Sequence, residues 1–318
     1  MAEDEEPPTT GDDAGDELPA EGGGLEIPPQ TPLFRAVNLA RYRRQELIKA
    51  VQAHTGRKLI TYVADLSAAM TREDAVPLMD LLHQVDTGTD IDFLLQTPGG
   101  DVDAADKIVR ILRKRVGEKG TLRVVVPDCA KSAGTLLALG AHLIVMSDSS
   151  ELGPIDPQII APGSAGQPTR RPAHTYVDGY DALVAKIDDP ASYADGKDTK
   201  AEQLLLNKCD PALLDLCRQA IRRSRRLAEK LLKQGMLQEG AWSEVAGRLT
   251  DNETFLSQHG AVIDYQDAID LGLSVEYLEP NSKVWQAYWR LYCEERLALT
   301  AEVPKLFESD YASLPFDS

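Results

Sequence analysis

The chain has 318 residues, with 34 Lys and Arg against 51 Asp and Glu and a net charge of −17. This balance argues against nucleic acid or an anionic membrane as the main partner, because phosphate contacts need clustered cations. Hydrophobic residues make up 43% of the chain, enough for a sizeable core. No window approaches 18 uninterrupted apolar residues, so no stable membrane insertion is expected.

The four cysteines, at positions 129, 209, 217 and 293, show neither CxxC spacing nor zinc-finger pairing with histidine. We therefore expect neither a disulfide framework nor a metal site, and a cytoplasmic protein. The N-terminus has ten acidic residues and no Lys or Arg within residues 1–30. Such a sequence lacks the basic start and apolar run of a signal peptide, and residues 1–33 are predicted to be a disordered acidic tail.

Elements alternate between strand and helix after the tail. A helix is predicted from Pro32 to about Gly56. Apolar or β-branched runs predict strands, and 3.6-residue periodicity predicts helices. The resulting order is strand 58–66, helix 73–85, strand 91–96, helix 101–116, strand 122–126, helix 132–140 and strand 143–146. Repeated β-α units of this length predict a mostly parallel sheet with covering helices.

The pattern changes after Gly153. We predict a Pro/Gly-rich loop over 161–172 and a turn-rich stretch over 188–200. Helices are predicted at 176–187, 201–208, 211–234, 241–248 and 265–271, with a strand at 273–277. The expected domains are a main domain over 34–280 and a C-terminal helical extension and tail over 281–318, whose helix covers 283–299.

Two glycine-bearing turns follow strands of the predicted sheet: Thr97-Pro98-Gly99-Gly100 and Lys131-Ser132-Ala133-Gly134. Ligands of parallel sheets bind beyond the carboxyl ends of the strands. Glycines let a backbone turn sharply and let a ligand approach its N–H groups. Ser132 at a helix start has two interpretations, a helix cap or a nucleophile beside oxyanion-stabilising N–H donors.

The order of these elements and turns resembles the ClpP/crotonase superfamily, and most of all the serine dehydrogenase proteinase family. The segment IDFLLQTPGGDVDA (91–104) resembles an oxyanion loop, and residues 124–157 resemble a nucleophile helix and the following strand. DAIDLGL (267–273) resembles the closing helix of ClpP-type domains. The resemblance implies a ClpP/crotonase-like α/β fold.

The resemblance also implies a catalytic site. Ser132 would be the nucleophile, and N–H groups of Ala133 and of the Gly99-Gly100 turn would form the oxyanion hole. The family's Ser-Asp-His order implies Asp156 as the orienting acid and His259 as the base. The related signal peptide peptidase A family uses a lysine base, which makes Lys186 the alternative. Lys131 is expected to be a surface charge near the cleft.

The resemblance thus implies a soluble ATP-independent serine peptidase, acting on a peptide or protein substrate as a homo-oligomer, with no cofactor. Three alternatives remain open: a Ser-Lys dyad peptidase, a crotonase-like acyl-CoA enzyme and a non-catalytic scaffold. A further cluster on the predicted helix 211–234 is expected to be a solvated or subunit-facing surface rather than an anion site. It consists of Arg218, Arg222, Arg223, Arg225 and Arg226.

Overall fold

The computed structural model describes residues 31–162, 167–189, 199–237, 240–251 and 261–317. The chain divides into two compact units, residues 1–39 and residues 40–318. The described part of the first unit is Thr31 and the first turns of helix α1 (Pro32–Thr55), whose later turns belong to the second unit. Residues 1–30 of the predicted acidic tail lie outside the described residues.

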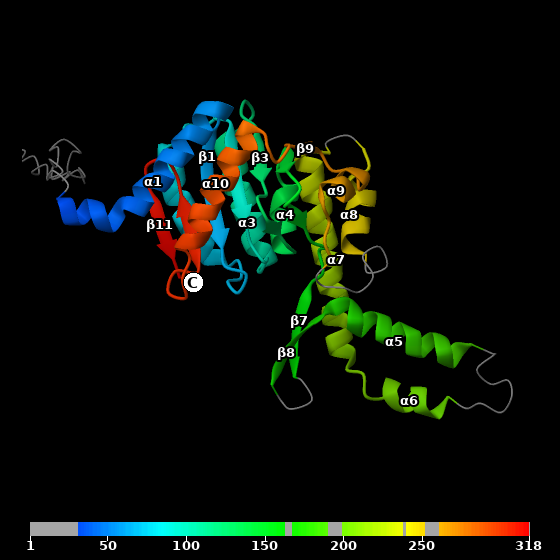
Figure 1. Ribbon diagram of the computed structural model, residues 1–318. Coiled ribbons are helices and arrows are strands. Elements are labelled where there is room, and N and C mark those ends of the chain that lie inside the picture. Colours follow the sequence, from blue (N-terminus) through cyan, green and yellow to red (C-terminus); the bar gives the residue numbers. More distant parts are fainter. Residues whose placement is uncertain (1–30, 163–166, 190–198, 238–239, 252–260, 318) are drawn as a thin grey trace, which may run out of the picture. The chain divides into compact units, whose positions relative to one another are not determined.

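A seven-stranded sheet forms the centre of the second unit, in the order β11-β10-β1-β2-β3-β5-β9 (Figure 1). Neighbours from β1 to β9 in this order are parallel, whereas β10 is antiparallel to β1 and β11 is antiparallel to β10. The strands are β1 (Lys58–Ala64), β2 (Ile91–Gln96), β3 (Leu122–Val125), β5 (Leu143–Met146), β9 (Val275–Tyr277), β10 (Lys305–Glu308) and β11 (Ser313–Phe316).

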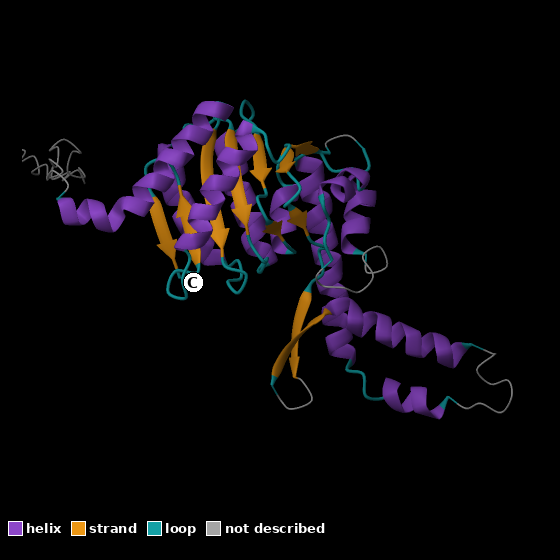
Figure 2. Cartoon of the chain, in the orientation of Figure 1, coloured by secondary structure: helices purple, strands orange, loops and turns teal. Residues whose placement is uncertain are grey.

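Helices cover both faces of this sheet (Figure 2). Because side chains alternate across a strand, Leu59 packs on one face while Ile60 packs on the other. The face of Leu59 carries α1 and α10 (Lys283–Ala298). The helices on the face of Ile60 are α2 (Ala75–Leu81), α3 (Val102–Val116), α4 (Ala133–Leu139), α7 (Pro211–Gln234), α8 (Trp242–Thr250) and α9 (Tyr265–Asp270). The predicted α/β fold, a mostly parallel sheet with covering helices, is confirmed.

Short elements complete the described chain. Two-residue strands β4 (Cys129–Ala130) and β6 (Glu151–Leu152) pair in parallel. The 3-10 turns are η1 (Arg72–Asp74) and η2 (Leu82–Gln84), and the remaining helices are α5 (Ala173–Asp188) and α6 (Lys200–Leu206). None of the described helices is long and apolar enough to span a bilayer.

Two segments differ from their sequence predictions. The predicted loop over 161–172 is largely a hairpin, in which β7 (Gln158–Pro162) pairs antiparallel with β8 (Pro168–Pro172). The predicted C-terminal tail contains β10 and β11, and it lies in the same compact unit as the rest of the sheet. Both segments contain prolines, which hide the alternation of a strand, and four-residue strands carry little periodicity.

Candidate active site

The two predicted glycine turns lie side by side at the carboxyl end of β2. The Thr97 N–H donates to the Cys129 carbonyl at 3.0 Å, and the Lys131 N–H donates to the Thr97 carbonyl at 3.1 Å. These bonds form a parallel bridge between Thr97 and Ala130. The turn after β2 is therefore held by main-chain hydrogen bonds against the residues that lead into α4.

Gly99 and Gly100 are required by close backbone approach at this junction. Both have positive φ, 95° for Gly99 and 151° for Gly100. A Cβ on Gly99 would lie 2.6 Å from the Lys131 carbonyl oxygen and 3.0 Å from the Ser132 Cβ. A Cβ on Gly100 would lie 2.3 Å from the Met70 carbonyl oxygen. Real Cβ atoms do not approach other atoms so closely, so the glycines let the turn touch the backbone around Ser132.

Ser132 stands at the N-cap of α4 with φ 51° and ψ −109°. It is the one non-glycine residue with positive φ in the described ranges. Its side chain makes no capping hydrogen bond, so the helix-cap interpretation does not describe it. Every residue of α4 is buried, and packing of this helix therefore holds a backbone conformation that L-residues rarely adopt.

Main-chain N–H groups beside Ser132 differ in whether they are already bonded. The Gly99 N–H donates to the Thr97 Oγ1 at 3.1 Å. Within the described part of the chain, no group accepts from the N–H of Gly100 or of Ala133. These two N–H groups are therefore open to a ligand oxygen in the described structure, whereas the Gly99 N–H is already bonded.

Cys129 is a second candidate nucleophile close to Ser132 in the sequence. Burial, and then the charge of Asp128, raise the pKa of Cys129 to about 11. Its thiol contacts the Gln96 side chain at 3.4 Å. Because a thiol with this pKa stays neutral near pH 7, Cys129 is unsuited to nucleophilic attack.

Asp156 follows a segment tied to α4. The Thr135 Oγ1 lies 2.8 Å from the Gly153 carbonyl oxygen, and the Ile155 N–H donates to the Leu249 carbonyl at 2.9 Å. Asp156 itself is half-buried and accepts a hydrogen bond from the Gln158 Nε2 at 3.2 Å. The structure therefore fixes the backbone leading to Asp156 against the helix that Ser132 begins.

His259 lies outside the described residues, and Ala261, two positions later, is the next described residue. The Ala261 carbonyl accepts from the Lys131 Nζ at 3.2 Å. Ile263 forms a bridge to Leu152 of β6, with N–H···O distances of 2.9 and 3.1 Å. Ala261 and Ile263 are therefore attached to Lys131 and to β6.

The prediction that Lys131 is a surface charge is wrong, because its side chain is only 20% exposed. Its ammonium group also donates to the Leu152 carbonyl at 3.2 Å and pairs with Glu151 at 2.9 Å. A Cβ at Gly153 would lie 2.6 Å from the Lys131 Cδ, so this glycine makes room for the stem. Two features of the sequence could have indicated this buried role for Lys131. It directly precedes the candidate nucleophile, and the pair Gly153-Pro154 lies further along the chain.

Lys186 occupies an exposed position near the C-terminal end of α5. A lysine acts as a general base when burial lowers its pKa. Lys186 is not buried in this way in the described structure. The structure brings Gly99, Gly100, Ser132 and Ala133 together without a contribution from Lys186.

Part of this chain, including the candidate nucleophile, matches a known protein family. Residues 37–169 match the family described as ClpP-like SDH-type serine proteinase. Two uncharacterised proteins of Methanocaldococcus jannaschii are 30% identical over 212 residues and 27% identical over 225 residues, each match covering 67% of this chain. The chain spans less than two thirds of either relative, 62% and 66% of their lengths.

Two similar solved structures are mutants of a membrane-bound stomatin-specific protease, one of them in complex with a substrate peptide. They are 18% and 16% identical, with TM-scores of 0.28 and 0.26. The two matches cover 75% and 67% of this chain, and 99% and 94% of the respective solved chains. The family match is the more specific finding, and it includes Ser132 and Asp156 but ends before Lys186 and His259. The resemblance of this chain to the serine dehydrogenase proteinase family is thereby confirmed over residues 37–169.

Proposed function

We propose that the protein is a serine-type endopeptidase that cleaves peptides through an acyl-enzyme on Ser132. The observation that carries the proposal is the backbone of Ser132, with φ 51° at the start of a buried helix and no capping bond from its side chain. Strained conformations of this kind cluster at catalytic sites, and a serine on a sharp strand-to-helix turn presents its hydroxyl for attack. The family match supports the same conclusion.

The oxyanion hole of this proposal consists of the Gly100 and Ala133 N–H groups. Attack of the Ser132 Oγ on a peptide carbonyl forms a C–O bond and shifts the carbonyl electron pair onto oxygen. Preorganised N–H donors stabilise that negative charge. Both N–H groups lack an acceptor within the described residues, which supports their assignment to this role.

His259 is the proposed base and Asp156 the group that orients it. His259 would remove the Ser132 proton during attack and deliver it to the leaving amine, after which water releases the acyl group. Two residues span at most about 7 Å, so the attachment of Ala261 to Lys131 supports a base delivered from this segment. The exposure of Lys186 disfavours the Ser-Lys alternative.

We propose that the enzyme uses no cofactor. We also propose that it is a cytoplasmic homo-oligomer, as expected from the sequence. Exposed apolar side chains on α6, Leu204 and Leu205, support a contact between copies.

The test is hydrolysis of a fluorescently labelled unfolded protein such as casein. We expect Ser132→Ala and His259→Ala each to lower kcat/KM by about 10³-fold or more, because the two groups act as a unit. Asp156→Asn should also lower kcat/KM, because asparagine would favour the wrong tautomer of the His259 imidazole. Lys186→Ala is the matched control and should retain activity. Loss of activity in Lys186→Ala with full activity in His259→Ala would contradict the proposed base, and full activity in Ser132→Ala would contradict the proposed function.

A further inference from the structure

Helices α3 and α7 carry an excess of positive charge in a strongly acidic chain. The α3 sequence has five Lys and Arg against two Asp, and the α7 sequence has seven against one Asp and one Glu. The whole chain has a net charge of −17. Two helices on the same face of the sheet therefore both carry an excess of positive charge.

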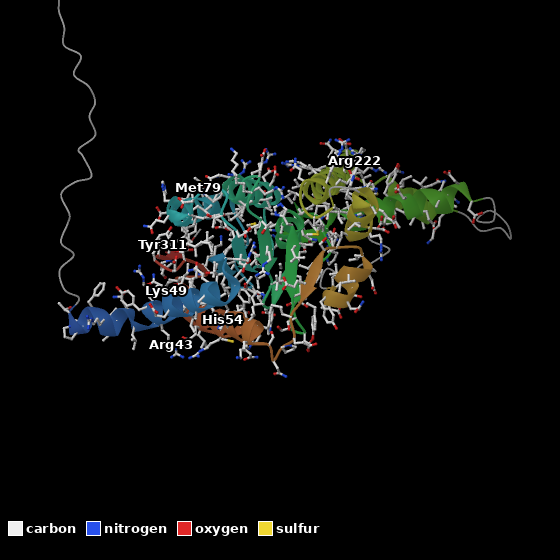
Figure 3. The ribbon with its side chains drawn as sticks, turned by 90° about the horizontal axis from the view of Figure 1, so that it is seen from above. Arg43, Lys49, His54, Met79, Arg222 and Tyr311 are labelled. Carbon is white, nitrogen blue, oxygen red and sulfur yellow. The ribbon has the colours of Figure 1, made fainter. Side chains whose placement is uncertain are left out.

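Side chains of the second half of α7 meet those of α3, and α4 packs against both helices. Arg223 of α7 pairs with Asp103 of α3, and the Lys230 Nζ lies 3.0 Å from the Asp106 Oδ1. We call the cations that border this junction the basic surface (Figure 3 labels Arg222). It consists of Arg110 and Lys114 of α3 with Arg222, Arg223, Arg226 and Lys233 of α7.

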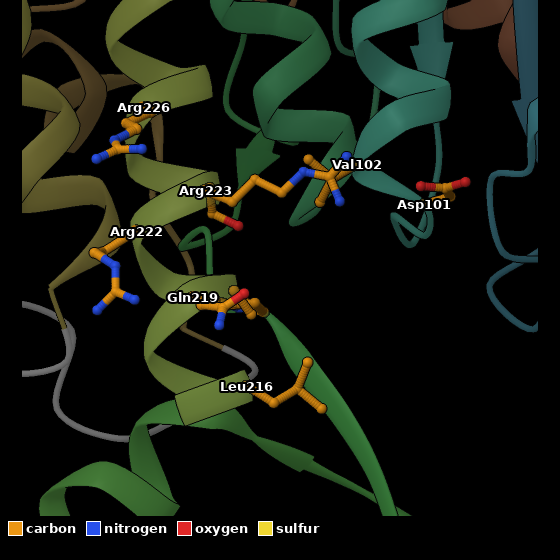
Figure 4. Close-up of a pocket in the computed structure, with 10 residues that line it drawn as sticks. Asp101, Val102, Leu216, Gln219, Arg222, Arg223 and Arg226 are labelled. Carbon is orange, nitrogen blue, oxygen red and sulfur yellow. The ribbon is translucent and has the colours of Figure 1, made fainter. Parts of the chain in front are cut away.

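Two depressions follow the junction between the helices. One, of about 610 Å³, is lined by Arg110, Lys114 and Lys233. The other, of about 590 Å³, is lined by Arg222, Arg223 and Arg226 (Figure 4). In Figure 4 the Arg223 side chain extends toward Val102, and Arg222 and Arg226 project from the other side of α7. Cations thus border both depressions.

The second depression adjoins the candidate active site. Its lining includes Asp101, which directly follows Gly100, and Pro157, which directly follows Asp156. Asp101 is engaged as the N-cap of α3, where its side chain accepts from the Asp103 N–H. A polypeptide crossing the oxyanion turn would therefore continue into a depression bordered by arginines.

Within the described ranges, the carboxylates that pair with Arg110 and Arg223 also pair with cations outside the basic surface. Asp103 is shared between Arg223 and Arg72, and Asp106 between Arg110 and Lys230. Each of these carboxylates thus serves two cations.

The α7 arginines at the depression are also weakly partnered. Arg222 has its carboxylate partner at 4.0 Å and a 54% exposed side chain. Arg226 is exposed and makes no ion pair within the described residues. The basic surface therefore keeps positive charge for an external partner.

We propose that the basic surface binds an acidic segment of a polypeptide substrate and leads it to Ser132. This rests on the proposed peptidase function. A short acidic peptide experiences mainly the local charge within about 8 Å at physiological salt. A nucleic acid duplex extends beyond the surface and meets the strongly acidic remainder of the chain, so a polypeptide is favoured.

The test measures binding to full-length protein carrying Ser132→Ala, so that it does not depend on hydrolysis. The probe is a fluorescein-labelled 15-residue peptide rich in Glu, compared with the same peptide carrying Gln at each Glu position. We expect at least tenfold tighter binding of the Glu peptide at low salt, weakening as ionic strength rises. The triple variant R222Q/R223Q/R226Q should lose about tenfold or more.

The matched control removes three exposed cations from the opposite face of the sheet, in K49Q/K283Q/R290Q, and should bind as the parent does. Equal losses in both triple variants, or equal binding of both peptides, would overturn the proposal. Tighter binding of a 20-base-pair DNA duplex than of the Glu peptide would overturn the assignment to polypeptide. Failure of the peptidase function would appear separately, as unchanged hydrolysis in Ser132→Ala.

Discussion

Ser132 and Lys131 are consecutive residues whose side chains have different tasks. The positive φ of Ser132 carries a conformational cost of about 1–3 kcal/mol, which the buried helix that follows it must offset. Lys131 extends away from that helix to three acceptors, on Glu151, Leu152 and Ala261. Ser132 is thus the proposed nucleophile, and Lys131 holds Ala261.

Lys131→Met tests this positioning role. Methionine keeps a similar length but removes the charge and all three hydrogen bonds. We expect kcat to fall by about 10- to 100-fold with little change in KM, because a displacement of about 1 Å of a catalytic group has effects of this size. Steady-state hydrolysis kinetics would measure both constants, and Lys131→Arg should recover part of the loss.

Lys283→Met, an exposed lysine on α10, is the control and should match the wild type. A merely structural role for Lys131 predicts a lower melting temperature with unchanged kcat in the folded fraction. That outcome would refute the positioning role.

Buried carboxylates join α10 to β1 and join β10 to α1. The Thr61 Oγ1 donates to the Glu295 Oε1 at 2.6 Å, and Arg44 donates to both oxygens of Glu308 at 2.7 and 2.9 Å. Glu295 and Glu308 are fully buried. Burial, and then the negative charge of Glu308, raise the pKa of Glu295 well above its ordinary value. The one arginine here therefore pairs with Glu308, and the buried Glu295 favours its neutral form.

Glu295→Gln should change how stability depends on pH. Unfolding releases the Glu295 proton above the ordinary glutamate pKa of about 4.3, so this group's contribution to stability falls as pH rises toward its folded pKa. Glutamine keeps the acceptor for Thr61 and has no proton to release. We expect the variant to gain on the wild type by up to about 1.4 kcal/mol per pH unit as the pH rises above the ordinary glutamate pKa, measured by urea unfolding.

Glu302→Gln removes an exposed carboxylate near the same strand and should leave the slope unchanged. Parallel stability curves for wild type and Glu295→Gln would show that Glu295 is ionised in the folded protein at these pH values.

At the scale of the whole molecule, the regular part of the fold could be predicted from the sequence. Long apolar strands such as β2, and amphipathic helices such as α3 and α7, carry many residues of consistent periodicity. The short strands β10 and β11 could not be predicted. Their place depends on the long-range pairing of β10 with β1, for example Leu306 with Val63, and on the pairing of β11 with β10, and no local pattern encodes the pairing with β1.

The candidate site was predicted unevenly. The two glycine turns and Ser132 are local features, and the structure brings them together. The contact between Lys131 and Ala261 joins residues 130 positions apart, and the pairing of α3 with α7 gives the arginines a shared surface. Both depend on tertiary packing, which explains why the sequence alone favoured a solvated role for these cations.

The most direct measurement of the central claim is the site of labelling by a fluorophosphonate in the native protein. A Ser132 Oγ activated by a base attacks phosphorus and displaces fluoride, which leaves a stable adduct. Peptide mass spectrometry should place the adduct on Ser132, and His259→Ala should label much more slowly while Lys186→Ala labels at the wild-type rate. An unlabelled native protein, or an adduct on a different serine with Ser132 unmodified, would contradict the assignment of Ser132 as the nucleophile.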